Sequence, residues 1–256
     1  MGHQETYRHN EAYAEFLSGW DINFYSKYID NLSISTTENT EVPKILDVGC
    51  GVGQVVLKLK ERGFSAYGID VSEANIARAT QHSPSCTLYN GKKLPFENNF
   101  FDSVGSLNVL EHVEEPELFL QELVRVTKPQ GKITVSSPNF LRVIGFRDYH
   151  PRMRGLNNKI HNALSLLKIL KQIRLSPEKV SFEKMPPIVK EPFTADDDAI
   201  IVTNPLQISF FLKRYGCEIK QISCTDRYVN PLIDWILNLT PLKLMMFNGF
   251  ITARKL

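Results

Sequence analysis

The sequence predicts an α/β protein with a doubly wound, mostly parallel sheet of seven strands whose last strand is antiparallel. Residues 44–70 alternate strand, glycine-rich turn, helix and strand, and the same alternation continues to residue 138. Two strand-like runs close the chain after residue 216, as expected for an antiparallel pair beside a parallel sheet. The expected parts are N-terminal helices with a linker (1–43), the α/β core (44–138), a basic helical cap insertion (139–202) and the C-terminal part of the core (203–256).

The composition limits the class of protein. With 256 residues and 43% hydrophobic content, the chain can build one sizeable core. A net charge of +2 does not indicate nucleic-acid binding, and no run reaches the roughly 18 apolar residues of a membrane-spanning helix. The four cysteines lack C-x-x-C spacing, and the polar N-terminus lacks a secretory segment. We therefore expect a soluble, cytoplasmic protein with no nucleic-acid partner, no spanning segment and no metal site.

Aromatic residues mark the N-terminal segment, where residues 8–32 are expected to form one or two helices. The rings are Tyr13, Phe16, Trp20, Phe24, Tyr25 and Tyr28. Because large aromatic side chains are usually buried, packing against the core is the first interpretation. Residues 33–41 are polar and without periodicity, which predicts a linker before the core.

The stretch Lys44–Asp70 organises the core. The apolar run at 45–48 predicts a buried strand, residues 54–62 predict a helix that Gly63 ends, and residues 65–69 predict a second strand. The turn before the helix contains Gly49, Gly51 and Gly53. Glycines let a ligand approach the backbone closely, and the first N–H groups of the next helix attract an anionic group.

Two carboxylates flank this turn. Asp70 ends the second strand about 20 residues after the turn, where a carboxylate can accept hydrogen bonds from both ribose hydroxyls. Asp47 precedes the turn, where it would repel a pyrophosphate and favour a ligand with an amino group. Gln54 stands where the dinucleotide fingerprint needs its third glycine. These residues favour a nucleoside with an amino group over a dinucleotide.

Strands and helices continue to alternate after Asp70. Ser72 is the expected N-cap of a helix to residue 81, strands are expected at 86–90, 101–107 and 132–136, and an amphipathic helix is expected at 117–127. Open α/β sheets bind ligands at the carboxyl ends of central strands. Residues directly after 107 are therefore candidates for the site.

In this order, the motifs resemble those of class I S-adenosylmethionine-dependent methyltransferases of the small-molecule type. The matching pieces are Asp47-Val48-Gly49-Cys50-Gly51-Val52-Gly53, Gly68-Ile69-Asp70-Val71-Ser72, Leu94-Pro95-Phe96 with Phe101-Asp102, Leu107-Asn108-Val109-Leu110-Glu111-His112-Val113, and Leu123, Arg125, Val126, Lys128, Pro129, Gly131 and Lys132. The resemblance is close over residues 44–138 and implies a Rossmann-like fold that binds S-adenosyl-L-methionine. In this family N-terminal helices also cover the cofactor, which is a second interpretation of the aromatic rings.

The resemblance implies a cofactor site drawn from several motifs. Asp70 would bind ribose, and Asp47 would orient the methionine amino group through a backbone or water relay. The implied contacts of the methionine part are Gly49, Gly51, Gly53, Leu107 and Asn108, and the other implied contacts are Cys50, Val71, Asn90, Gly91 and Lys92.

Two of the candidate positions leave alternatives open. Relatives with the Leu-Pro-Phe motif commonly carry Asp where this chain has Asn90, and that Asp accepts from the adenine amino group. The side-chain carbonyl oxygen of Asn90 could accept in the same way. Alternatively, Asn90-Gly91 only forms a turn. His112 is a candidate general base, because imidazole takes up a proton near neutral pH. It could instead only pack where the fourth strand ends. Because the family shows this histidine in enzymes with differing substrates, the second interpretation is preferred.

Residues 139–202 interrupt the alternation and are expected to form the cap. Between residues 142 and 174 there are eight basic residues and one acid, Asp148. Residues 158–174 have a helical period, with an apolar face of Ile160, Leu164, Leu167, Leu170 and Ile173. Three interpretations remain open: a helical cap whose apolar face covers the substrate cleft and whose basic face is solvated, recognition of an anionic substrate group, or weak contact with an anionic membrane surface. The acidic run Asp196–Asp198 is expected in an exposed loop, with cation binding as the alternative.

The last part of the chain completes the sheet. Asn204 is the expected N-cap, and Pro205 the first residue, of a helix that runs to Tyr215 and stops at Gly216. Antiparallel strands are expected at 217–224 and 244–254. Residues 226–241 contain Trp235, either in a short core helix or in the wall of the substrate site.

Together these features predict methyl transfer from S-adenosyl-L-methionine to a small molecule, at an oxygen of a quinone-like, lipid-linked or sugar substrate. An anionic acceptor is one option. Base-modifying amino-methyltransferases carry an Asn/Asp-Pro-Pro-aromatic run after the fourth strand, and Ser106-Leu107-Asn108-Val109 differs from it, which disfavours nucleobases. The alternatives are a non-catalytic S-adenosylmethionine-binding sensor or scaffold, and a nicotinamide oxidoreductase, which Gln54 and Asp47 argue against.

Overall fold

Seven strands form the main sheet, in the order β3-β2-β1-β4-β5-β9-β8. The structure is a computed structural model that describes residues 11–34, 41–145, 148–188, 196–239 and 241–256. The strands of this sheet are β1 (Lys44–Val48), β2 (Ser65–Asp70), β3 (Cys86–Leu88), β4 (Phe101–Leu107), β5 (Thr127–Pro138), β8 (Cys217–Ser223) and β9 (Asn248–Lys255). Of these described strands, only β9 runs in the opposite direction to the others, and it pairs antiparallel with both β5 and β8. The predicted fold class is therefore confirmed.

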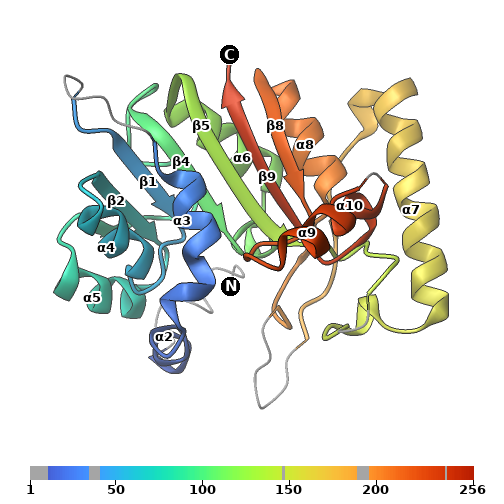
Figure 1. Cartoon of the computed structure of the whole chain (residues 1–256), viewed down its shortest axis with the longest axis horizontal. Helices are drawn as coiled ribbons and strands as arrows, with labels where there is room; N and C mark the ends of the chain where they lie inside the picture. Colours follow the sequence, from blue (N-terminus) through green and yellow to red (C-terminus); the bar gives the residue numbers. More distant parts are fainter. Residues whose placement is uncertain (1–10, 35–40, 146–147, 189–195, 240) are drawn as a thin grey trace.

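Helices cover both faces of the sheet (Figure 1). They are α2 (Glu11–Ser18), α3 (Ser26–Leu32), α4 (Gln54–Glu61), α5 (Glu73–His82), α6 (Pro116–Val126), α7 (Leu156–Leu175), α8 (Pro205–Arg214), α9 (Pro231–Leu237) and α10 (Leu242–Met245). Short 3-10 turns are η1 (Ile22–Tyr25), η2 (Leu110–His112), η3 (Pro151–Met153) and η4 (Pro177–Lys179), and β6 (Glu183–Lys184) pairs with β7 (Ile201–Val202) apart from the main sheet. None of the described helices combines the length and the apolar character that crossing a bilayer requires.

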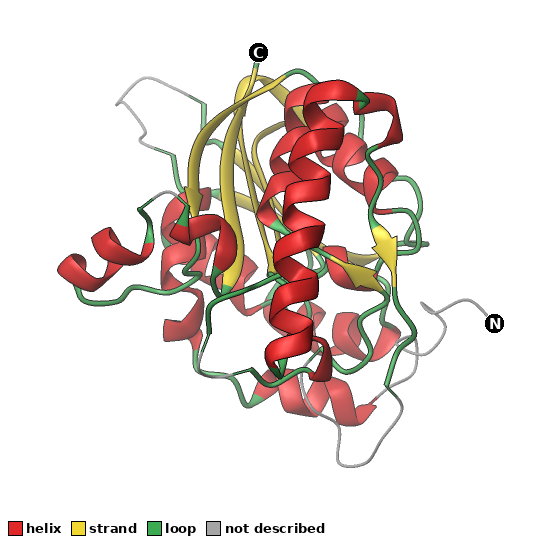
Figure 2. Cartoon of the chain, turned by 90° about the vertical axis from the view of Figure 1, so that its right-hand side faces the viewer, coloured by secondary structure: helices red, strands yellow, loops and turns green. Residues whose placement is uncertain are grey.

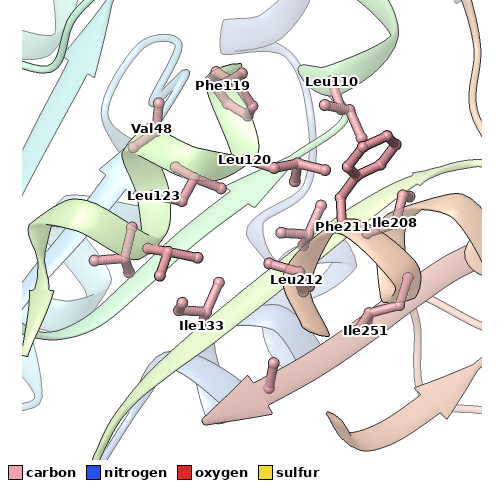
Figure 3. Close-up of a cluster of buried hydrophobic side chains, with 14 of the residues drawn as sticks. Val48, Leu110, Phe119, Leu120, Leu123, Ile133, Ile208, Phe211, Leu212 and Ile251 are labelled. Atoms are coloured by element: carbon pink, nitrogen blue, oxygen red, sulfur yellow. The ribbon is translucent and has the colours of Figure 1, made fainter. Parts of the chain in front are cut away.

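The sheet separates two hydrophobic cores. Successive residues of β1 point to opposite faces, so Ile45 packs with α3 and α4 while Leu46 and Val48 pack with α6 and α8. Figure 3 shows the second core, where side chains of α6 and α8 meet over β5 and β9. Both faces are covered, which is why successive residues in the central parts of β1 and β4 are buried.

The N-terminal helix α3 is fixed to the centre of the sheet. Gly105 in β4 makes room for it, because a Cβ on Gly105 would lie 2.3 Å from the Tyr28 hydroxyl. The buried Lys27 ammonium donates to the Ser223 hydroxyl at 3.0 Å and to the Thr225 carbonyl at 2.8 Å, at the end of β8. Helix α3 therefore connects the first and last parts of the core.

The predicted caps and stops agree with the structure. The Ser72 hydroxyl accepts from the Asn75 N–H at 3.2 Å, and the Asn204 side chain accepts from the Gln207 N–H at 3.0 Å. Gly63 and Gly216 end α4 and α8 with φ of +88° and +87°.

The structure differs from the predicted ranges near the C-terminus and in the linker. Residues 244 and 245 belong to α10, and β9 begins only at Asn248. The predicted strand began too early because the apolar run before Asn248 is continuous, and such a run does not distinguish a helix from a strand. Trp235 is exposed, and no residue of α9 is buried, so α9 is neither a core helix nor part of the cavity wall described below. Residues 35–40 of the predicted linker and Arg147 of the basic segment lie outside the described residues.

Helix α7 lies on the outside of the molecule, against α8 (Figures 1 and 2). Its buried side chains are Asn162, Leu166 and Ile169, with Ile173 packed beside them. The interpretation that its apolar face covers a substrate cleft is wrong, because Ile160, Leu164, Leu167 and Leu170 of that face are exposed. Two stripes of this helix have the right period, and the sequence pattern does not say which one faces the core.

Candidate functional site

A cavity lies at the carboxyl ends of β1, β2 and β4. Strand β1 pairs with β2 on one side and with β4 on the other, which is the point where ligands bind in such sheets. The predicted site residues that line the cavity are Asp47, Gly49, Cys50, Gly51, Asp70, Val71, Leu107, Asn108 and His112. The predicted contacts that do not line it are Gly53, Asn90, Gly91 and Lys92.

The glycine turn after β1 has a backbone that other residues rarely adopt. Gly49, Gly51 and Gly53 have φ of +77°, +52° and +82°. A Cβ on Gly49 would lie 2.2 Å from Cγ2 of Val109, and one on Gly53 would lie 2.9 Å from Cβ of Ala79. Gly49 therefore lets the loop after β4 approach the turn, whereas Gly53 serves the packing of α4 against α5.

Asp70 is held at the end of β2 by three hydrogen bonds. Its Oδ2 accepts from the Gly51 N–H at 2.9 Å, and its Oδ1 accepts from the Ser72 N–H at 2.8 Å and the Asn75 amide at 3.3 Å. Burial raises the pKa of Asp70, and these hydrogen bonds oppose that shift. The carboxylate is thus fixed in direction at the cavity wall.

Asp47 is buried at the end of β1 and lines the same cavity. Its Oδ1 accepts from the Tyr28 hydroxyl at 2.7 Å. Burial raises the pKa of Asp47 to about 7, and the hydrogen bond from Tyr28 opposes this shift. Asp47 therefore changes charge close to neutral pH.

Two further acceptors in the cavity wall have no donor among the described residues. They are the buried side-chain oxygens of Gln54 and Asn75. The Gln54 amide nitrogen is already used, since it donates to the Trp20 carbonyl at 3.3 Å. Together with Asp47 and Asp70, the wall offers acceptors to a ligand that carries hydroxyl and amino groups. A nucleoside with an amino-acid part has these groups.

Aromatic rings of the N-terminal segment form another wall. Tyr13, Phe16, Trp20 and Tyr25 line the cavity, and the rings of Phe16 and Trp20 meet edge to face at 5.7 Å. Tyr28 is completely buried in the core below and also reaches the cavity. Tyr28 therefore packs in the core, as the first interpretation expects, whereas the other four rings line the cavity.

Asn90 lies outside the cavity in an exposed turn. Its Oδ1 accepts from the Lys92 N–H at 3.0 Å, so this oxygen already has a donor in the local turn. Tyr89, directly before it, lines the cavity instead. Tyr89 was not predicted, because relatives with the Leu-Pro-Phe motif have their polar residue at the next position, that of Asn90.

His112 lies in the cavity wall between two acids. Its Nδ1 is 3.8 Å from Oδ1 of Asp198, and its Nε2 is 3.9 Å from Oε1 of Glu111. Glu111 is completely buried, and burial raises its pKa far above the usual range, with the nearby charge of Asp196 adding to the shift. Its Oε2 accepts from the Ser137 hydroxyl at 2.9 Å.

The expectation of an exposed acidic loop at 196–198 is wrong. Asp197 is buried, and Asp196 and Asp198 line the cavity. The loop is pulled inward because the Ile200 N–H donates to the Glu111 carbonyl at 2.9 Å and the Tyr149 hydroxyl donates to Asp196 at 2.6 Å. These partners are distant in sequence, so no local pattern could reveal them.

The same acids create an arrangement that the sequence did not predict. One ligand atom from each of Glu111, His112 and Asp196 lies within 4.8 Å of the others. This spacing would allow the three residues to share one cation, as in the alternative interpretation of the acidic run, whereas the main expectation was no metal site.

Part of the chain resembles known methyltransferases in sequence. Residues 46–135 match the family model of the methyltransferase domain. The ubiquinone biosynthesis O-methyltransferase of Rickettsia canadensis (strain McKiel) is 34% identical over 108 residues, which are 39% of this chain and 44% of that protein. The 2-methyl-6-phytyl-1,4-hydroquinone methyltransferase of Synechocystis sp. is 34% identical over 101 residues, 37% of this chain and 32% of that protein. The matched region thus spans less than half the length of these relatives.

Solved structures resemble the chain over nearly all its length. A S-adenosylmethionine-dependent methyltransferase from Mesorhizobium loti has a TM-score of 0.60 at 16% identity, covering 93% of this chain and 100% of that one. A SAM-dependent methyltransferase from Aquifex aeolicus has a TM-score of 0.56 at 14% identity, covering 97% and 100%. At such low identity these likenesses show the fold. Residues 46–135 therefore match a methyltransferase domain, and the chain has the fold of class I S-adenosylmethionine-dependent methyltransferases.

Proposed function

We propose that this protein transfers the methyl group of S-adenosyl-L-methionine to a hydroxyl oxygen of a neutral, quinol-like small molecule. The carrying observation is that Asp47 and Asp70 flank one glycine turn in one cavity. The names of the two relatives, one for ubiquinone biosynthesis and one for a phytyl hydroquinone, support a quinol acceptor.

The cavity wall suits this cofactor. When bound, S-adenosyl-L-methionine supplies a methyl group that is already activated by a positively charged sulfur. Asp70 would accept from the ribose hydroxyls, and Asp47 and Gln54 would accept from the methionine amino group. Tyr89 and Val71 would contact the adenine end, in place of Asn90. The rings of the N-terminal segment would keep water away from the reacting atoms, which strengthens electrostatic interactions there.

His112 would take up the proton of the acceptor hydroxyl. A general base must lie in the cavity, and His112 does so, with the Asp198 carboxylate 3.8 Å from Nδ1. That carboxylate would stabilise the imidazolium after proton transfer. The position of His112 thus favours its role as a general base, although the sequence alone favours the interpretation that it only packs.

The charge of the wall argues against an anionic acceptor. Among the described residues, the cavity is lined by four aspartates (Asp47, Asp70, Asp196 and Asp198) and by no lysine or arginine. A carboxylate or phosphate on the acceptor would face like charges. Those basic residues that prompted the anionic option and that the structure describes lie on and around α7, outside this wall.

A cytoplasmic location remains part of the proposal. All four cysteines are free thiols, which suits a reducing compartment.

Calorimetry with S-adenosyl-L-methionine, S-adenosylhomocysteine and NAD tests the cofactor assignment. We expect the first two to bind, NAD not to bind, and Asp70→Ala to weaken binding at least tenfold. Asp226→Asn, which changes a carboxylate outside the cavity wall, is the matched control. Binding of NAD alone would refute the proposal.

Incubation with labelled cofactor and a set of catechols and hydroquinones tests the reaction. We expect label on the acceptor oxygen, and we expect His112→Gln to lose transfer while still binding the cofactor. Cofactor binding without transfer to any acceptor of a cell extract would favour the sensor or scaffold instead.

A further inference from the structure

Helix α7 turns an apolar stripe to the solvent. We call Leu156, Ile160, Leu164 and Leu167 the α7 stripe, since they follow one another at spacings of four, four and three residues. Their exposed fractions lie between 52% and 75%. A contiguous apolar patch on a surface helix often marks a site that contacts another protein or a membrane.

The opposite side of α7 is fixed to the protein, so the stripe cannot turn inward. Leu166 and Ile169 pack in a core with Phe140 and Met153. The buried Asn162 amide donates to the Phe140 carbonyl at 3.3 Å and to the Arg142 carbonyl at 3.1 Å. Turning the stripe inward would break these hydrogen bonds and leave buried carbonyls without donors.

Basic residues continue the outward side beyond the stripe. Lys168, Lys171 and Arg174 are exposed, and at 100° per residue they lie on the same arc as the stripe. No ion pair of these three occurs within the described part of the chain. Helix α7 contains no acid from Leu156 to Leu175. The outward side therefore combines apolar and purely positive groups.

This charge decides between possible partners. A second copy of the chain would bring its own α7 bases against these bases, which repel each other. A neutral protein groove would cover the stripe but would leave the three cations without a partner. A surface with phosphates above an apolar layer satisfies both, because Lys and Arg stems can lie along apolar groups while their charges reach the phosphates.

We propose that the α7 stripe and its three bases form a docking surface for an anionic lipid bilayer. The helix would lie in the plane of the bilayer surface, with the leucines and Ile160 at the acyl boundary and the bases among the headgroups. This inference concerns α7 alone and does not depend on the proposed methyl transfer.

Sedimentation of the full chain with vesicles tests the proposal. The vesicles contain phosphatidylcholine alone, or phosphatidylcholine mixed with phosphatidylglycerol. We expect binding to the mixed vesicles and much weaker binding to the neutral ones, with salt reducing the affinity. K168Q/K171Q/R174Q should lose about a hundredfold in affinity, since each base near such a surface contributes about fivefold. L164Q/L167Q should lose at least tenfold.

Matched variants separate α7 from the rest of the surface. L118Q changes an exposed leucine on α6, and K58Q/K220Q/R254Q removes three bases elsewhere; both should bind like the wild type. L232Q/W235Q changes the exposed apolar side of α9. An unchanged melting temperature shows that each variant is folded.

Several results would overturn the proposal. These are no binding to anionic vesicles, equal binding to both compositions, or wild-type binding by the α7 variants. If only the α9 variant L232Q/W235Q lost binding, the bilayer-binding surface would be on α9 and not on α7. A dimer in light scattering that L164Q/L167Q converts to a monomer would identify a second copy as the partner.

Discussion

At the scale of single residues, the two carboxylates beside the glycine turn differ in how they are held. Asp70 accepts two backbone N–H groups and an amide, whereas the single described partner of Asp47 is the Tyr28 hydroxyl. Burial is the largest influence on both, and it raises the pKa of Asp47 to about 7. Asp70 is therefore a fixed acceptor, and Asp47 is a group that responds to pH.

Asp47 should make the stability of the protein depend on pH. Its pKa is about 7 in the folded protein and about 3.9 in an unfolded chain, so the folded state binds the proton more tightly. The stabilisation from this proton is complete below about pH 4 and is lost as the pH rises through about 7. Within that window the free energy of unfolding should fall by about 1.4 kcal/mol per pH unit from this group.

Urea unfolding of the wild type and Asp47→Asn at several pH values measures this effect. Asparagine keeps an acceptor for Tyr28 but does not titrate, so the variant should lack this part of the pH dependence. Other buried acids contribute equally to both proteins and cancel in the difference. Parallel curves for the two proteins would contradict the assignment.

His112→Gln should lower the turnover number by about 10²–10⁴-fold, because general base catalysis is typically worth that factor. Its affinity for S-adenosyl-L-methionine should stay within about twofold, since the residue would act on the acceptor hydroxyl. The measurement is the turnover number with the best acceptor found, beside calorimetry. His82→Gln, on the exposed end of α5, is the control and should retain full activity. A lowered cofactor affinity with unchanged turnover would place His112 at the cofactor instead.

At the scale of elements, the turn between β1 and α4 lies against the loop that follows β4, and both line the cavity. Gly49 is the contact point, because its missing Cβ is the space that Val109 fills. The turn is also tied to β2, since the N–H groups of Gly49 and Cys50 both donate to the Ile69 carbonyl. The absence of a side chain at Gly49 thus allows these two loops to pack against each other.

Gly49→Ala and Gly63→Ala form a matched pair for this contact. Both positions have a positive φ, of +77° and +88°, so both substitutions carry a backbone cost of about 1–2 kcal/mol. A Cβ on Gly63 meets nothing within 4 Å, whereas one on Gly49 would clash with Val109. Gly49→Ala should therefore cost about 1–3 kcal/mol more, and it should also weaken cofactor binding. Equal free energies of unfolding for the two variants would show that the close approach of Val109 is unimportant.

The elements also show what could be predicted from the sequence. Local sequence patterns predicted most strands and helices and the N-caps Ser72 and Asn204. They also predicted that Asp47 and Asp70 lie at one site, and both line the cavity. The sequence did not show which side of α7 faces the solvent, because two stripes of the helix have the same period. The stripe that is buried contains the polar residue Asn162. Its burial depends on carbonyls of residues 140 and 142. The entry of Asp196 and Asp198 into the cavity depends in the same way on distant partners.

At the scale of the whole molecule, the cavity is shared by the N-terminal segment, the α/β core and the loop before β7. Residues from 13 to 198 line it. A ligand that binds there contacts segments far apart in the chain, and the folded state alone brings them together. Binding should therefore stabilise the protein as a unit.

S-adenosyl-L-methionine at about 100 times its dissociation constant should raise the free energy of unfolding by about 2.7 kcal/mol. Asp70→Ala at the same concentration should gain less, in proportion to its weaker binding, while Asp226→Asn should gain as much as the wild type. Urea unfolding with and without the cofactor measures this. Equal stabilisation of Asp70→Ala and the wild type would remove Asp70 from the cofactor site.

The anchoring of Lys27 has a consequence for how the chain is made. Its partner Ser223 comes 196 residues later, so a ribosome working at about 5–20 residues per second produces Ser223 roughly 10–40 s after Lys27. During that interval the helix that carries Lys27 lacks its hydrogen bonds to the residues at the end of β8. The segment around Lys27 is thus anchored late, and nascent chains should leave it accessible to chaperones until β8 has been made.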